Sequence, residues 1–377
     1  MLAVALGALL VAPAASAAAP AFGVNAQFLL PNQPPSAWPN HLDAMQRDGI
    51  AVVRSDANWA VAEPAAPVSG QRRFNWGPFD VTVAELAKRG LQWLPIVDFS
   101  APWAASQPPS PHAPPSNPDL YAGYAAALAA RYGPGGAFWA AHPEIPPVPV
   151  AALEVWNEPD TAAFWPPAPN PAAYADLYLA TRDAVHTAAG SVEVLVGGLT
   201  QDPPGFLRAM VAARPQLRER LDGVAIHPYA ASPTDVMARV ITTRATLNDL
   251  GLGDVPLDVT EVGWPIAGSS RYLPTIDDRT RADAFTQLVD RFADSGCGIE
   301  RVLPHTWVSG ERNRGSAEDW YGIVHPNGSP TLTATAYAAA IAHVREHRPS
   351  TSPLPRCPDR ASSTPAVGAG AWLGLAS

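Results

Sequence analysis

Two glutamates, Glu158 and Glu261, are the residues in this chain best placed to do chemistry. Each closes a short apolar run and precedes a stretch that favours a helix: 151–156 leads into Glu158, and 255–260 leads into Glu261. In a barrel of alternating strands and helices, a carboxylate that ends a strand faces the active site. Two such carboxylates, one donating a proton and the other attacking or activating water, are what cleavage of a glycosidic bond requires.

The two carboxyl groups need different protonation states, and other residues can provide them. Glu158 must carry a proton near neutral pH, which requires burial and nearby negative charge. Glu261 must stay ionised, which requires positive charge from Arg54 and a hydrogen bond donated by the hydroxyl of Tyr229. Asn157 can donate its amide to a sugar 2-hydroxyl, a contact that strengthens as the oxocarbenium-like state forms.

Two supporting roles have alternatives that the sequence leaves open. Arg54 could neutralise Glu154, which has the same strand parity as Glu158 and so points into the barrel, instead of supporting Glu261. His227 could orient either the nearby tyrosine or the proton donor. An isolated Asn-Glu-Pro tripeptide also occurs by chance, so the assignment of both glutamates depends on their joint spacing.

Aromatic side chains are the candidates for stacking on sugar rings. Trp307 offers a flat apolar face for the ring at the cleaved subsite. The candidates for further substrate contacts are Trp59, Trp103, Trp264, Trp165, Trp320 and Asp98. For each of these tryptophans, packing in the core or in a loop is the alternative interpretation.

A repeated theme along the chain would position these residues: a short apolar run, a loop and an amphipathic helical stretch. The predicted strands are 22–26, 51–54, 92–97, 151–156, 192–196, 223–226, 257–260 and 300–303. The intervening stretches carry helix signals, such as Asn170-Pro171 at one start and Gly190 past the end. Eight alternations predict an α/β fold, a (β/α)8 barrel with enlarged loops. A doubly wound open sheet is the rival, but no Gly-rich phosphate fingerprint follows an early strand.

The spacing of the two glutamates agrees with this barrel. They are 103 residues apart, three strand–helix units, which places them at the ends of strands four and seven. The long loops follow strands three, four, seven and eight, at 100–118, 159–170, 263–276 and 308–329. Long loops on one face predict a walled binding cleft there.

Several motifs together resemble glycoside hydrolase clan A, the retaining glycosidases built on this barrel, over residues 22–347. The segment 156–159 (WNEP) resembles the acid/base motif of the clan, and 260–264 (TEVGW) resembles its nucleophile motif. The remaining similarities are the His-x-Tyr at 227–229, the strand-eight tryptophan at Trp307 and the nucleophile-supporting arginine at Arg54. The resemblance implies that Glu158 is the acid/base and Glu261 the nucleophile.

Within the clan, the 59–64 stretch and the 98–100 turn look most like family 39, with family 5 next. The family 5 pattern has a histidine near the end of strand three, where this chain has Asp98. This departure weakens the similarity to family 5 and leaves the local hydrogen bonding open.

Bulk composition excludes several other classes of protein. With 377 residues, 47% hydrophobic and 16% charged, the chain can bury a sizeable core. The net charge of −9 and the absence of a Lys/Arg block argue against a nucleic-acid partner. Histidines such as His112, His305 and His325 lack ligand spacing, and no serine elbow occurs, so no metal or other cofactor is expected.

The first 19 residues read as the apolar part of a secretory signal, although the basic n-region is missing. An uncleaved anchor is the alternative, but the apolar part is short for a membrane span. The catalytic domain is expected to cover 20–348, and a Pro/Ser/Ala-rich tail to cover 349–377. In an exported protein the two cysteines, Cys297 and Cys357, can pair below the barrel; two unrelated thiols are the alternative.

The sequence therefore predicts a secreted, monomeric, retaining glycoside hydrolase that needs no cofactor and cleaves β-type bonds in an oligo- or polysaccharide. Glu261 would form the glycosyl-enzyme and Glu158 would act as acid/base. A non-catalytic carbohydrate-binding barrel and a transglycosylase using the same intermediate are the alternatives.

Overall fold

The computed structural model describes residues 19–106, 110, 112–270 and 272–358. Its strands form one closed, all-parallel barrel in sequence order. They are β1 Ala21–Asn25, β2 Val52–Asn58, β3 Gln92–Asp98, β4 Ala152–Val155, β5 Glu193–Leu199, β6 Gly223–Ile226, β7 Leu257–Val259 and β8 Ile299–Val302. The predicted (β/α)8 barrel is confirmed, and each predicted strand overlaps an observed one.

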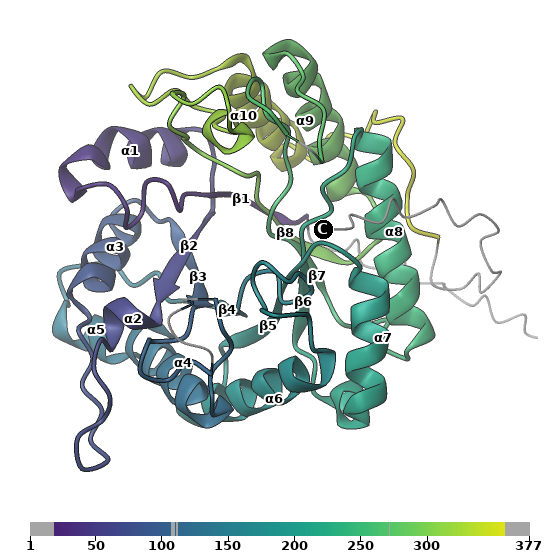
Figure 1. Ribbon diagram of the computed structural model, residues 1–377. Helices are drawn as coiled ribbons and strands as arrows, with labels where there is room; N and C mark the ends of the chain where they lie inside the picture. The colour runs from purple at the N-terminus through teal and green to yellow at the C-terminus, as the bar shows by residue number, and fades with distance from the viewer. Residues whose placement is uncertain (1–18, 107–109, 111, 271, 359–377) are drawn as a thin grey trace, which may run out of the picture.

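Helices surround the barrel, as Figure 1 shows. They are α1 Pro39–Arg47, α2 Trp59–Ala62, α3 Gly77–Ala87, α4 Pro118–Tyr132, α5 Ala137–Ala141, α6 Pro171–Ala188, α7 Pro203–Ala213, α8 Pro233–Asp249, α9 Asp278–Ala293 and α10 Leu332–Arg345. Two helices are capped where the sequence predicts their starts. The side chain of Asn170 accepts the Ala173 N–H of α6 at 3.0 Å, and that of Ser232 accepts the Asp235 N–H of α8 at 3.2 Å. No helix in the described ranges is long and apolar enough to cross a membrane.

The inside of the barrel is built in layers. One layer is apolar and consists of Val52, Leu94, Ala152, Leu195, Ala225 and Leu303. Toward the N-terminal ends of the strands lies an ionic layer, in which Arg301 donates to Asp258 at 2.9 Å and to Glu193 at 2.6 Å. Because side chains alternate along a strand, Arg54 and Glu154 also point inward. They lie two residues after Val52 and Ala152, and so on the C-terminal side of the apolar layer.

Helix tyrosines hold the strands that carry the site. The Tyr121 hydroxyl on α4 donates to the Val97 carbonyl on β3 and accepts the Trp156 N–H just past β4 at 3.1 Å. Tyr174 on α6 donates in the same way to the Val155 carbonyl at 2.7 Å. These buried hydrogen bonds fix the C-terminal ends of β3 and β4, from which the loop carrying Glu158 departs.

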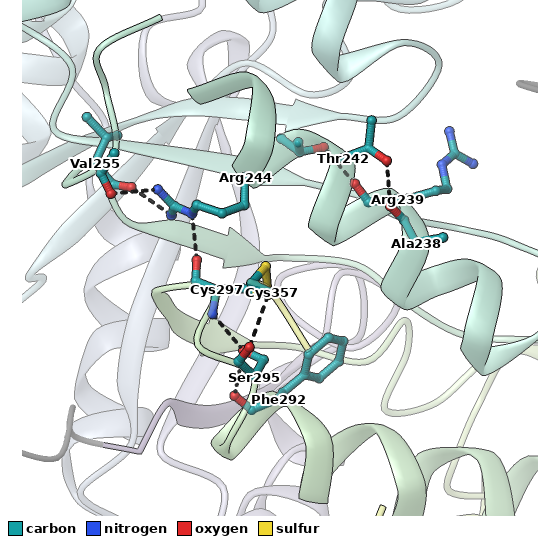
Figure 2. The surroundings of a disulfide bond; sticks show 11 residues. Ala238, Arg239, Thr242, Arg244, Val255, Phe292, Ser295, Cys297 and Cys357 are labelled. Carbon is teal, nitrogen blue, oxygen red and sulfur yellow. Dashed lines mark hydrogen bonds between the residues drawn. A yellow bond between two sulfur atoms is a disulfide. The ribbon is translucent and has the colours of Figure 1, made fainter. Parts of the chain in front are cut away.

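A disulfide joins Cys297, in the turn between α9 and β8, to Cys357, as predicted. Figure 2 shows its surroundings, where the Arg244 side chain donates to the Cys297 carbonyl at 2.7 Å. Turns from helix to strand lie at the N-terminal side of the barrel, opposite the loops that carry the site. Thr351 also binds Asp290 through its N–H at 2.7 Å, so the described start of the predicted tail packs on the barrel.

The predicted signal segment, apart from residue 19, and residues 359–377 of the predicted tail lie outside the described residues. The role expected for each therefore stays a prediction.

Removing the disulfide should lower stability without affecting chemistry. The cysteines are 60 residues apart, and a loop of this length gives about 4 kcal/mol in the chain-entropy model. We expect Cys297→Ser/Cys357→Ser to lose about 2–4 kcal/mol in urea unfolding, with an unchanged catalytic rate. Thiol titration of unfolded, unreduced wild-type protein should find no free thiol; two free thiols would contradict the bridge.

Candidate active site

The loop after β4 places Glu158 by an unusual backbone path. Trp156 and Glu158 have φ angles of 70° and 46°, in the left-handed region that side-chain-bearing residues rarely adopt. Burial of Trp156 holds this strained turn, since its indole N–H donates to the Phe164 carbonyl at 2.6 Å. The Glu158 side chain is thereby turned inward over the end of the barrel.

The two predicted catalytic glutamates meet there. Carboxylate oxygens of Glu158 and Glu261 and a ring nitrogen of His227 all lie within 4.8 Å of one another. The side chains of Glu158 and Glu261 are 16% and 11% exposed, so both are largely shielded from solvent. The two carboxyl groups therefore lie next to each other at the C-terminal end of the barrel.

Arg54 on β2 lies beneath this pair and is completely buried. A guanidinium has five N–H bonds, and each finds an acceptor. The acceptors are Glu154 at 2.9 and 2.8 Å, Glu261 at 2.7 Å, Asn25 at 2.7 Å and Asn157 at 3.0 Å. The two alternatives for Arg54 are thus both true, because it pairs with Glu154 and Glu261 at once. Burial opposes its charge, but these two carboxylates outweigh burial and raise the pKa of Arg54.

Glu261 is surrounded by groups that favour its ionised form. Besides Arg54, the Tyr229 hydroxyl donates to it at 2.8 Å, and ring nitrogens of His227 and His305 lie 3.7 and 3.6 Å away. Burial alone would raise the pKa of Glu261, but the charges of these histidines and Arg54 and the hydroxyl bond lower it well below its usual range. Glu261 is therefore an anion at neutral pH.

His227 contacts the other glutamate most closely. Its Nδ1 lies 2.9 Å from Glu158, whereas its ring centre is 6.3 Å from that of Tyr229, so of the two roles left open it orients the predicted acid/base. Gly198 makes room for the ring: a Cβ there would come within 2.0 Å of His227 Nε2. The Gly198 N–H also donates to Glu154 at 2.8 Å, so this glycine is fixed by both packing and hydrogen bonding.

Asn157 lies between Arg54 and the site. Its amide oxygen accepts from Arg54 at 3.0 Å, which leaves the NH₂ end to point elsewhere. This orientation is the one required for donation to a sugar hydroxyl. The structure therefore brings together Glu158, Glu261, Arg54, Asn157, His227 and Tyr229.

The tryptophan predictions need correction. Trp307 is 1% exposed and its indole N–H donates to His41 at 3.1 Å, so its face packs in the core and is closed to a sugar. Trp59 and Trp264 are equally buried, at 0% and 1% exposure. Trp103 is partly exposed but donates its indole N–H to the Glu63 carbonyl at 2.9 Å. Asp98 ends β3 and is buried, with one carboxylate oxygen lacking a hydrogen-bond partner.

His305 takes the place expected for Trp307. It is 6% exposed, lies between Gln27 at 3.0 Å and Glu318 at 3.3 Å, and stacks edge-on against Tyr229. Burial would lower the pKa of His305, but Glu261 and Glu318 outweigh it and raise that pKa. The signal that could have found His305 is strand parity, since Leu303, two residues earlier, belongs to the inner apolar layer.

A metal ion could in principle use the oxygen and nitrogen atoms of Glu158, His227 and Glu261. The guanidinium of Arg54, 2.7 Å from Glu261, already supplies a positive charge to this carboxylate. A cation bound there would meet that charge at close range, so the donor set fits acid–base chemistry better than metal binding.

No family model and no curated protein matches this sequence. Among solved structures, a family 39 glycoside hydrolase from the gut symbiont Bacteroides cellulosilyticus WH2 aligns at 17% identity with a TM-score of 0.62, covering 86% of this chain and 64% of that one. A family 39 β-xylosidase from Caulobacter crescentus aligns at 17% identity with a TM-score of 0.65, covering 87% and 73%. A family 5, subfamily 18 structure from Streptomyces cattleya in complex with GlcNAc aligns at 17% identity with a TM-score of 0.63, covering 90% of this chain and 83% of that one.

At these identities the likeness establishes the barrel fold. The chain spans slightly less than two thirds of the first of these structures, 64% of its length.

Replacing Arg54 should damage both stability and the site. Arg54→Met leaves Glu154 buried without its cation, and breaking such a pair costs about 3–5 kcal/mol. We expect a loss of this size in urea unfolding. The control is Arg208→Met, whose ion pair with Asp249 is exposed and should contribute less than about 1 kcal/mol. An Arg54→Met protein as stable as the control variant would contradict the central role of Arg54.

Proposed function

We propose that this protein is a retaining glycoside hydrolase of the clan A type, most like family 39. The observation that carries the proposal is the approach of the Glu158 and Glu261 oxygens to within 4.8 Å in two different environments. Retaining enzymes have carboxyl groups about 5–5.5 Å apart, whereas inverting enzymes leave about 6.5–9.5 Å for a water molecule. The close approach therefore favours a covalent intermediate.

In the proposed reaction Glu261 attacks the anomeric carbon while Glu158 gives its proton to the leaving oxygen. Glu261 suits the first role because Arg54, Tyr229 and two histidines stabilise its anion, with Arg54 donating to Oε1 and Tyr229 to Oε2. Glu158 then accepts a proton from a water molecule that cleaves the glycosyl-enzyme, and His227 at 2.9 Å holds the carboxyl group in place. Asn157 would donate to the 2-hydroxyl as positive charge develops on the ring.

We also infer that the protein works outside the cytoplasm. Two observations support export: the apolar N-terminal segment of the sequence and the Cys297–Cys357 disulfide, a bond that persists in oxidising compartments. Detection of the protein in the culture medium, with its N-terminus at about residue 18–20, would test this inference; retention in the cytoplasm would contradict it.

Azide rescue should distinguish the two glutamates. With a 2,4-dinitrophenyl β-glycoside, Glu261→Ala should be nearly inactive and azide should give the α-glycosyl azide, because azide enters from the side of the lost carboxylate. Glu158→Ala should lose about 10²–10⁴-fold on substrates with poor leaving groups and should give the β-azide. Product configuration by NMR is the measurement.

The control for azide rescue is Glu144→Ala, since Glu144 is exposed and remote from the barrel end. If the wild-type enzyme binds glycans but hydrolyses none across polysaccharides and aryl glycosides, the protein is a binding barrel and the proposal is wrong.

Tyr229→Phe should move the acid side of the pH profile. Burial and the charge of Glu261 raise the pKa of Tyr229 well above its usual range, so its hydroxyl remains a donor. Loss of this bond removes one of the causes that lower the pKa of Glu261, so the acid limb of kcat/KM should shift to higher pH. We expect kcat/KM to fall about 10- to 100-fold. An unshifted limb would mean that Tyr229 does not support the nucleophile.

A further inference from the structure

A second pair of carboxyl groups lies at the same end of the barrel. Asp56 on β2 and Asp98 on β3 are on adjacent parallel strands, and the register pairs Asn58 with Asp98, so Asp56 is diagonal to Asp98. Both side chains point into the barrel, because residues two or four apart on a strand lie on the same face. Asp56 is two residues after Arg54, and Asp98 is four residues after Leu94, which pairs with Arg54 and belongs to the inner apolar layer. Neither acts in the acid–base chemistry proposed above.

Asp98 is buried and Asp56 is partly buried, and both carboxyl groups lack the partners that such charges normally have. In the described ranges neither forms an ion pair with a lysine, arginine or histidine within 4.0 Å, and Arg54 is already shared between Glu154 and Glu261. Asp98 is 3% exposed, yet its Oδ1 has no hydrogen-bond partner. The Ser100 hydroxyl, two residues further on and 2% exposed, also has none.

Buried polar atoms without partners cost about 1–3 kcal/mol each and are rare, so those present call for an explanation. A polar ligand at the C-terminal end of the barrel would provide the missing hydrogen bonds. Since Glu158, Glu261 and Asn157 surround the position of the anomeric carbon and the 2-hydroxyl, the side of β2 and β3 is left for the rest of the ring.

The electrostatics favour a neutral ligand over a cationic one. Burial, with the charge of Asp56 adding to it, raises the pKa of Asp98 well above its usual range, and burial also raises the pKa of Asp56 to about 6. At least one of the pair is thus protonated in mildly acidic solution, and the pair offers both a donor and acceptors. A sugar hydroxyl likewise donates and accepts, whereas an ammonium group only donates.

We propose that Asp56 and Asp98 bind two neighbouring hydroxyls of the sugar ring at the cleaved bond, on the side remote from the anomeric carbon, and so determine which sugars are accepted. The inference rests on the proposed hydrolase function. The ligand class it names is a neutral pyranose with free hydroxyls beyond the 2-position.

The test uses 2,4-dinitrophenyl β-glycosides of glucose, xylose, galactose and mannose, followed by the 3-deoxy and 4-deoxy analogues of the best substrate. Asp98→Asn and Asp56→Asn should each lower kcat/KM on the parent about 10- to 100-fold. On the analogue that lacks the hydroxyl bound by that residue, each should change kcat/KM less than about 3-fold. Asp119→Asn, an exposed acid in the first turn of α4, is the matched control; melting temperatures verify folding.

Three results would overturn the inference. Equal losses on parent and deoxy analogues would show a structural role for the pair. With the 3-amino-3-deoxy and 4-amino-4-deoxy glycosides added to the panel, a loss confined to these compounds would show that the pair binds an ammonium group instead. If wild-type protein cleaves none of these glycosides and no polysaccharide, the hydrolase proposal itself fails. An active enzyme whose variants lose equal activity on parent and deoxy substrates would instead contradict only the role of Asp56 and Asp98.

Discussion

The guanidinium of Arg54 is the interaction on which the rest of the site depends. Its five N–H bonds reach β1, the residues following β4 and β7, and Glu154 inside β4. A fully buried charge is stable only when it is paired and hydrogen-bonded on every side. The positions of Asn25, Glu154, Asn157 and Glu261 are therefore not independent: each satisfies the same cation, and a shift of any one leaves a buried donor unmet.

The ionic layer at the other end of the barrel gives an instructive contrast. Arg301 is also shared between two carboxylates, Asp258 and Glu193. A third carboxylate, that of Glu300, lies 3.6 Å from the same guanidinium, so all three of these acids face an arginine. Around Glu261 an additional carboxyl group, Glu158, has a histidine instead of an arginine as its neighbour. This difference in partners, not the presence of buried charge, is what separates a site that can transfer a proton from a structural ion pair.

The sequence predicted the strands and the residues at their C-terminal ends because both follow from hydrophobic periodicity and from the barrel topology. The prediction from sequence was incomplete where the inward and outward alternation of side chains continues past the predicted end of a strand. The sequence pattern predicts that strand β2 ends at Arg54, but the strand continues to Asn58, so the pattern does not reveal the inward position of Asp56. Ligand spacing among the histidines does not point to His305, and Trp307 is predicted from its flat apolar face and its place in the resemblance. Burial in a core depends on distant contacts, such as that with His41, which no local pattern contains.

The covalent link at Cys357 also has a consequence for how the molecule can be handled. It holds Cys357 at the face of the barrel where strands begin, whereas the proposed saccharide substrate would arrive where strands finish. A resin or a fluorophore coupled next to Cys357 would lie on the face of the barrel opposite the candidate site. Immobilisation at this position should thus leave the site open to the proposed polymeric substrates.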